Sequence, residues 1–125
     1  MYKGYKLIQE KYIKDVNSDC ILLEHEKTGA RVFLMKNNDD NKTFGIGFKT
    51  IPTDNTGICH IIEHCVLSGS RKFQTKEPFM DMVKISTATF LNAMTFPDKT
   101  VYPVSSRNEK DFKNFISEFL EDEAK

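Results

Sequence analysis

The sequence lacks the features that would assign it to a membrane or exported class. No apolar run approaches the roughly 20 residues that a membrane-spanning helix needs, so we expect no membrane partner. Residues 1–19 alternate charged and apolar side chains, without the apolar core of a secretory signal. The same stretch is too acidic for an organellar transit peptide. We therefore expect a cytoplasmic location.

The sequence also lacks a surplus of charge of one sign and a disulfide pattern. Eighteen basic and eighteen acidic side chains give a formal net charge of +0. A nucleic-acid-binding surface would need a basic stripe, so we expect no nucleic-acid partner. The three cysteines, Cys20, Cys59 and Cys65, contain no C-x-x-C pair and are odd in number, which fits a reducing compartment. A chain of 125 residues, 39% of them hydrophobic, suits one domain with a single core.

The hydrophobic pattern predicts strands, two helices, more strands and a last helix. Residues 1–20 are expected to form an extended or irregular lead-in. Strands are predicted at 21–26, 31–36, 43–49, 89–96 and 100–105, and helices at about 56–67, 77–86 and 112–120. This order favours an α+β fold, with a mainly antiparallel β-sheet and helices packed on one face.

Glycine and proline positions sharpen the prediction for individual strands. Gly29 lies between the first two predicted strands, where a hairpin turn can use its positive φ. In strand 43–49, Gly45 and Gly47 alternate with apolar residues, which leaves one bare face for the close approach of another element. The 56–67 helix would be a natural occupant of that face, although the sequence does not determine which element lies there. Pro103 lacks an N–H, so the last strand is expected to be an edge or bulged strand.

The most informative stretch is H-x-x-E-H, formed by His60, Glu63 and His64. On a helix the two histidines lie about 40° apart and one turn above each other. Both can therefore reach one metal ion at roughly 2.0–2.1 Å. Glu63 lies about 60° to the other side of His60, where its carboxylate can take a proton from a metal-bound water. The order is the reverse of the zincin motif and is the inverzincin pattern.

The motif's surroundings support a helix but leave a simpler alternative open. Polar residues 53–56 offer several side-chain N-caps just before Gly57, and residues 68–70 supply a C-terminal stop. Cys59 and Cys65 each lie about 100° around the helix from the neighbouring histidine, so we interpret them as small buried thiols rather than ligands. The alternative is an amphipathic helix with exposed or hydrogen-bonded histidines, whose apolar residues are Ile58, Ile61, Ile62, Val66 and Leu67.

Several further motifs, in a fixed order, accompany the histidine pair. They occupy residues 24–30, 56–64, 67–70, 76–79, 90–100, 102–104 and 110–112. Together they make the chain resemble the start of a pitrilysin/insulinase-family zinc peptidase, closest to the presequence protease and falcilysin branch. The resemblance runs from about residue 5 to about residue 119.

The resemblance implies a zinc metalloendopeptidase that hydrolyses unstructured peptides through zinc-activated water. By motif position His60 and His64 match the zinc ligands, and Glu63 matches the general base. Asn92 and Ala93 match a segment that holds the substrate peptide in extended form, which is β-augmentation. Zn²⁺ is thus the implied cofactor and peptides the implied substrates. Without the resemblance, Asn92 would be an ordinary polar strand residue, and His25 receives no role.

The chain departs from the family pattern at the third zinc ligand. In the family this is a glutamate on a downstream helix, which the resemblance puts beyond residue 125. Glu118, Glu121 and Glu123 align before that helix and receive no such role. We expect residues 1–125 to form a single, incomplete N-terminal catalytic-domain fragment, whose partners include the remaining domains of the full-length enzyme. Alone, the fragment is expected to be inactive or weakly active and prone to self-association.

Two other functions remain open at this point. The chain could be a truncated, non-catalytic module that binds peptides or supports assembly without a third zinc ligand. It could also hold a structural zinc closed by ligands from a second copy. Metal analysis of the purified chain distinguishes these from the peptidase.

Overall fold

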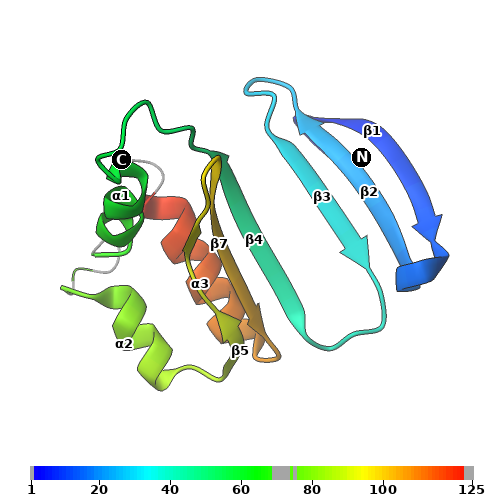
Figure 1. The fold of residues 1–125 in the computed structure, drawn as a ribbon. Coiled ribbons are helices and arrows are strands. Elements are labelled where there is room, and N and C mark those ends of the chain that lie inside the picture. The colour runs from blue at the N-terminus through cyan, green and yellow to red at the C-terminus, as the bar shows by residue number, and fades with distance from the viewer. Residues whose placement is uncertain (1, 69–73, 75, 123–125) are drawn as a thin grey trace. The chain divides into compact units, whose positions relative to one another are not determined.

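The computed structural model describes residues 2–68, 74 and 76–122, with side chains up to residue 117 within these ranges. The chain divides into two compact units, Met1–Asp39 and Asp40–Lys125 (Figure 1). We refer to them as the N-terminal and C-terminal units and consider each by itself.

The N-terminal unit is a three-stranded antiparallel sheet in the order β1-β2-β3. The predicted hairpin is confirmed, with Gly29 at φ +71° in its turn and two backbone hydrogen bonds of 2.8 Å closing it. The strands are β1 (Tyr5–Ile13), β2 (Ser18–His25) and β3 (Arg31–Lys36), with a short 3₁₀ turn η1 (Lys14–Val16) after β1.

The irregular lead-in predicted for residues 1–20 is wrong in one respect. The stretch is extended, as expected, but it forms the regular strand β1, which pairs with β2 along its length and carries one bulge between Leu7 and Gln9. Its alternation of charged and apolar residues is the period of a two-faced strand. The pairing partner that orders such a strand lies elsewhere in the chain, so the local pattern alone does not show it.

The described residues of the C-terminal unit form a second antiparallel sheet and three helices. Its strand order is β4-β7-β5, and the short strand β6 also pairs with β7. The strands are β4 (Lys42–Lys49), β5 (Ala88–Leu91), β6 (Met94–Thr95) and β7 (Lys99–Ser106); the helices are α1 (Ile58–Val66), α2 (Pro78–Ile85) and α3 (Glu109–Asp122).

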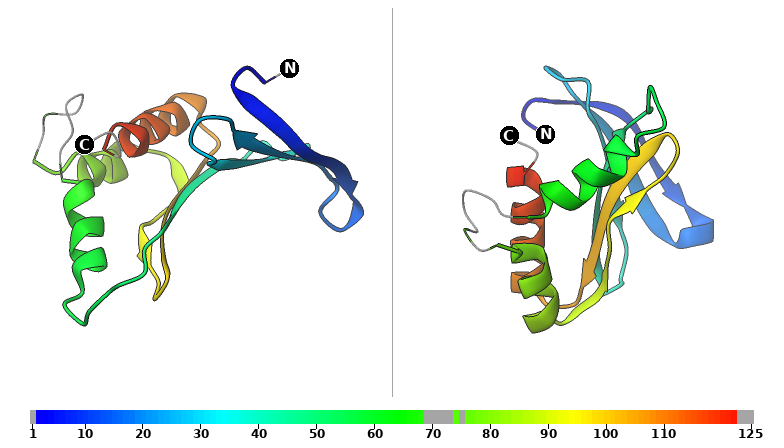
Figure 2. Two further views of the ribbon diagram at one scale, coloured as in Figure 1. Left: turned by 90° about the horizontal axis from the view of Figure 1, so that it is seen from above. Right: turned by 60° about the vertical axis from the view of Figure 1, so that its left-hand side comes forward.

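The core of this unit lies between one face of the sheet and the helices. Tyr102 and Val104 of β7, Leu67 after α1 and Phe115 of α3 form a buried cluster. Figure 2 shows the three helices on the same side of the sheet. The α+β fold with a mainly antiparallel sheet is therefore confirmed. Further apolar residues pack against the cluster: Phe44, Ile46, Phe48, Phe79, Met82, Ala88, Leu91, Ala93 and Phe112.

Two helices begin at residue types that favour helix starts, a proline and an asparagine. Pro78 opens α2, where its missing N–H costs nothing. Asn108 caps α3, its Oδ1 accepting from the backbone N–H groups of Lys110 (3.0 Å) and Asp111 (3.2 Å). The amphipathic pattern predicted for 112–120 places Phe115 inside, at 1% exposed, whereas the side chains of Phe119 and Leu120 lie outside the described residues. Among the residues described, no helix is both long and apolar enough to cross a bilayer.

The Pro103 strand is predicted to be an edge or bulged strand. The edge position is wrong, because β7 lies between β4 and β5, while the β5–β7 pairing does shift in register between Ala88 and Phe90. Pro103 pairs with Gly45 on one side, and on the other its carbonyl accepts from the backbone N–H of Asn92 (3.3 Å). In an antiparallel strand the N and the carbonyl of one residue point to the same side. The missing N–H of Pro103 thus faces the interruption between β5 and β6, where no ladder partner requires it.

The sequence left open whether the motif helix packs on the glycine face of β4, and the structure places the end of that helix on the other face. Leu67, at the end of α1, joins the core on the opposite face, beside the aromatic side chains of β4. A Cβ on Gly45 would meet nothing within 4 Å, and one on Gly47 would meet Val101 Cγ2 at 3.8 Å. The helix thus approaches the face that offers apolar area to bury, since burial stabilises packing more than close backbone approach does.

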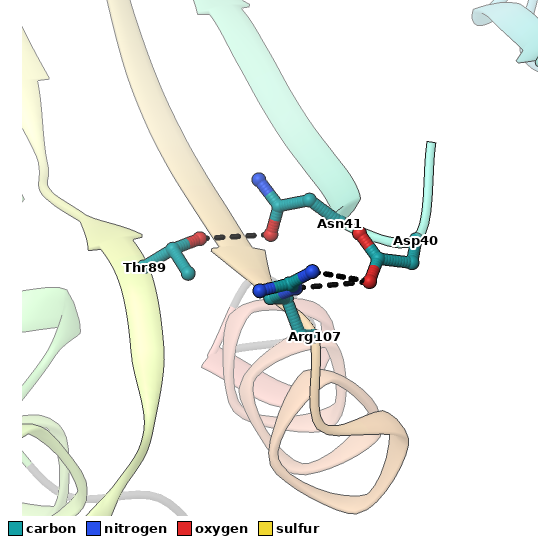
Figure 3. Close-up of polar contacts among 4 residues, drawn as sticks. All are labelled: Asp40, Asn41, Thr89 and Arg107. Atoms are coloured by element: carbon teal, nitrogen blue, oxygen red, sulfur yellow. Dashed lines mark hydrogen bonds and ion pairs between the residues drawn. The ribbon is translucent and has the colours of Figure 1, made fainter. Parts of the chain in front are cut away.

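Polar contacts link the residues just before β4 to β5 and to the residue just after β7 (Figure 3). The Arg107 side chain, just after β7, donates from Nε to Asp40 Oδ2 (3.1 Å), and Thr89 Oγ1 on β5 donates to Asn41 Oδ1 (2.8 Å). The hydrogen bond from Arg107, helped by its positive charge, holds the pKa of the exposed Asp40 carboxyl below its usual value. These contacts lie before β4, at the end of β7 and on β5.

Candidate metal and peptide site

The N-cap of the helix that carries the motif is a glycine, and no side chain caps the helix. Gly57 is the N-cap at φ +71°, and its carbonyl accepts from the N–H groups of His60 and Ile61 (3.1 Å each). The predicted polar N-cap is therefore wrong. Asp54 instead closes the preceding loop by accepting from the hydroxyl and the N–H of Thr56, which lowers the pKa of the Asp54 carboxyl.

The helix ends at the predicted stop. Ser68 follows it and donates from Oγ to the His64 carbonyl (3.0 Å), satisfying one of the free carbonyls of the last turn. Gly69 and Ser70, the rest of the predicted stop, lie outside the described residues. At Ile58–Val66, α1 is shorter than the predicted 56–67 by one or two residues at each end.

The two motif histidines converge on one point in space. The Nε2 atoms of His60 and His64 lie 3.1 Å apart, with ring centroids 4.9 Å apart and ring planes inclined by 39°. Both side chains are exposed. This is the arrangement that the i, i+4 spacing predicts, with one ring above the other on the same face of the helix.

The donor set of this pair fits two of the ligands of a zinc ion. Imidazole nitrogens at about 2.0–2.1 Å from a tetrahedral Zn²⁺ lie about 3.3 Å from each other, close to the observed separation. In the described part of the chain no group of three His, Cys, Asp or Glu side chains is arranged around one point. The side chains of Glu118 and Glu121, and all of Glu123, lie outside the described residues.

Glu63 has a different environment from the histidines that flank it. Its side chain is only 6% exposed, and Oε2 accepts a hydrogen bond of 2.5 Å from the Thr95 hydroxyl on β6. It is the one buried residue within α1. Ile58, Ile61 and Ile62 are each about half exposed (46%, 55% and 50%), whereas Leu67, just after the helix, is buried. The amphipathic-helix alternative, in which the histidines are simply exposed or hydrogen-bonded, stays open. The helix turns its carboxylate inward and its isoleucines outward.

The cysteines beside the histidines do not match their expected burial. Cys59 is half-buried and Cys65 is exposed, so the interpretation of both as buried thiols is wrong for Cys65. The reason is that α1 contacts the sheet through β6, which leaves much of the helix surface open. Cys20, by contrast, is buried in the N-terminal unit.

One open pocket of about 410 Å³ brings the predicted site residues together. The Asn92 side chain accepts from the backbone N–H of Ala93 (2.9 Å), and both residues lie between β5 and β6. His25 belongs to the N-terminal unit, where its Nδ1 lies 2.8 Å from the Thr28 hydroxyl. The residues that line the pocket are His60, Glu63, His64, Leu67, Ser68, Glu77, Phe79, Met80, Asn92, Ala93 and Thr95.

Several pocket residues received no role from the sequence. Thr95 touches Glu63, and Glu77, Phe79 and Met80 line the wall contributed by α2 and the residue before it. Thr95, Glu77 and Phe79 lie in the family-like segments 76–79 and 90–100, and Met80 follows the first of them. The available signal for Thr95 was its place in the segment that also contains Asn92. A hydroxyl at that position does not by itself show which helix packs against the strand.

The residues of this site lie within the part of the chain that matches known proteins. The family model described as Insulinase (Peptidase family M16) matches residues 43–122. Similar proteins include "Protein HypA" of Clostridium perfringens, 52% identical over 97% of this chain, and the chloroplastic/mitochondrial presequence protease 1 of Arabidopsis thaliana, 50% identical over 94%. The mitochondrial presequence protease of Mus musculus is 40% identical over 94% of this chain.

The matched relatives are much longer than this sequence. The 125 residues span 12%, 11% and 11% of the lengths of these three proteins, respectively.

Proposed function

The chain belongs to the insulinase family of peptidases, and from this premise we propose that its complete gene product is a zinc metalloendopeptidase for unstructured peptides. The observation that carries the proposal is the convergence of His60 and His64, with Nε2 atoms 3.1 Å apart, beside the buried carboxylate of Glu63 in one open pocket. The relatives named as presequence proteases support the same reaction class.

His60 and His64 would hold the zinc ion through Nε2. When bound, zinc supplies Lewis-acid polarisation of the scissile carbonyl and lowers the pKa of a water molecule towards about 7. Glu63 acts as the general base: its carboxylate accepts a proton from the attacking water and later returns it to the leaving amine. Its position one residue before His64, on the same helix, keeps the proton acceptor close to the ligand pair.

Asn92 and Ala93 would bind the substrate peptide. They lie where β5 has ended and β6 has not begun, and they share the pocket with the histidines. A peptide that lies there in extended form can add main-chain hydrogen bonds to the sheet, as in β-augmentation. Binding through the main chain explains a preference for unstructured peptides, because a folded substrate has already paired its own backbone groups.

The direct test is Glu63→Gln in the complete gene product. Gln cannot accept the proton, so peptide hydrolysis should fall about 10²–10⁴-fold, while zinc measured by atomic absorption stays at the wild-type ratio. Glu26→Gln, the same change at an exposed turn of the N-terminal unit, is the matched control and should retain full activity. Unchanged turnover in Glu63→Gln rejects the general-base role.

A second function is favoured by one observation: the described residues offer two ligands, and no group of three, for a metal ion. The protein could then be a non-catalytic module that binds peptides in the same pocket. Metal-free protein that binds a fluorescent unstructured peptide without cleaving it, even with added zinc, would support this alternative.

A further inference from the structure

We propose that Thr95 is the positioning residue of the Glu63 carboxylate, an inference that rests on the proposed function. Thr95 Oγ1 donates to Glu63 Oε2 at 2.5 Å. The hydroxyl occupies one carboxylate oxygen and leaves Oε1 as the proton acceptor.

The burial of Glu63 makes this contact consequential. A carboxylate at 6% exposure has lost most of its hydration, and a buried charge is costly unless it is hydrogen-bonded. In the described part of the chain, Thr95 supplies the side-chain hydrogen bond that this carboxylate accepts. Without it, Glu63 would gain by rotating towards water and away from the place where a base is needed.

Thr95 is itself held by the sheet rather than by the motif helix. It pairs with Thr100 of β7, which is 3% exposed, and the Thr100 hydroxyl lies 2.8 Å from that of Thr50. A β-branched side chain on a strand has restricted χ1, so the direction of its hydroxyl is well defined. The strand β6 also contacts α1. Thr95 therefore fixes the general base relative to the strand segment that follows Asn92 and Ala93.

The test compares two substitutions of Thr95 in the complete gene product. Thr95→Val keeps the shape but removes the hydroxyl, so kcat should fall about 10- to 100-fold, with KM changing less than about twofold and zinc content unchanged. Thr95→Ser keeps the hydroxyl and should retain kcat within about threefold of wild type. Thr89→Val, which removes a hydroxyl that bonds Asn41 outside the pocket, is the matched control and should keep kcat and KM.

A second measurement needs neither zinc nor turnover. In metal-free protein, Thr95→Val should lower the urea midpoint when Glu63 is present, because it leaves a buried carboxylate without its donor. In a Glu63→Ala background the same substitution should have little effect, so the two changes are non-additive. A structural role of the Thr95 hydroxyl that does not involve Glu63 would instead give the same shift in both backgrounds.

The outcomes separate the inference from the proposed function. A large loss in Glu63→Gln with none in Thr95→Val overturns the role of Thr95 alone, as does a Thr95→Ser variant that is as impaired as Thr95→Val. Unchanged turnover in Glu63→Gln overturns the proposed function and with it the catalytic meaning of Thr95. If Thr95→Val does not fold, the kcat of Thr95→Ser against Thr95→Ala decides the same question.

Discussion

The three histidines share a side chain but differ in their contacts. The Nε2 atoms of His60 and His64 lie 3.1 Å apart, whereas His25 contacts a threonine hydroxyl in the N-terminal unit. We expect His60→Ala and His64→Ala each to abolish stoichiometric zinc binding, because each removes one of the three protein ligands that a catalytic zinc site uses. His25→Ala is the control and should bind zinc like wild type.

Equilibrium dialysis followed by metal analysis makes the measurement on the complete gene product. Circular dichroism shows whether each variant is folded, so that lost zinc is not confused with lost structure. Full zinc content in either His60→Ala or His64→Ala would contradict the ligand assignment, and loss of zinc in His25→Ala would point to a different site.

At the scale of single residues, the sequence predicts the convergence of the two histidines better than it predicts the contacts of Glu63. The i, i+4 spacing places two imidazoles on one helix face whatever the helix packs against, so the convergence of His60 and His64 follows from local geometry. The burial of Glu63 and its bond from Thr95 depend on which strand meets the helix. Residues 32 positions apart in the chain carry no local pattern that reports such a contact.

The elements depend on a few backbone positions, and the start of α1 is the most sensitive. Gly57 has φ +71°, a left-handed conformation that L-residues avoid, although a Cβ there would meet nothing within 4 Å. Gly57→Ala should therefore destabilise the protein by about 1–2 kcal/mol through backbone strain alone. Gly45→Ala is the matched control, since Gly45 also has open space around it and no positive φ, and it should change stability by less than about 0.5 kcal/mol.

Urea denaturation of the two variants checks this prediction. Strain at the N-cap should also loosen the first turn of α1, so hydrogen exchange at the amides of His60 and Ile61, which donate to the Gly57 carbonyl, should quicken in Gly57→Ala. Equal stability of the two variants would show that the loop before α1 relaxes the positive φ without cost.

The elements themselves were largely predictable, and the two wrongly placed strands have one cause. Helices α2 and α3 and the β2–β3 hairpin follow from proline, asparagine and glycine acting locally. The positions of β1 and of the Pro103 strand depend instead on distant partners. Pro103 is tolerated inside the sheet because β5 stops at Leu91, a break that lies twelve residues earlier in the chain.

The molecule as a whole divides its tasks between elements of the C-terminal unit. Helix α1 carries the histidines and the proposed base, the β5–β6 interruption carries the proposed peptide-binding residues, and β7 joins them through Thr100 and Pro103. The fold class follows from element order, which the sequence displays. The meeting of α1 with β6 follows from the core around Tyr102 and Leu67, which becomes visible only when the sheet is assembled.

The ligand count leads to a prediction for the 125-residue chain taken alone. A catalytic zinc site uses three protein ligands and an open position, and the described residues bring two to the pocket. We therefore expect the purified chain to lose zinc on dialysis and to leave an unstructured peptide intact over hours. Stoichiometric zinc together with hydrolysis would show that the 125 residues are sufficient as an enzyme and would contradict the prediction. Zinc-dependent dimers with one ion per two chains would instead indicate a structural site, because two copies supply the four imidazoles that a closed tetrahedral site requires.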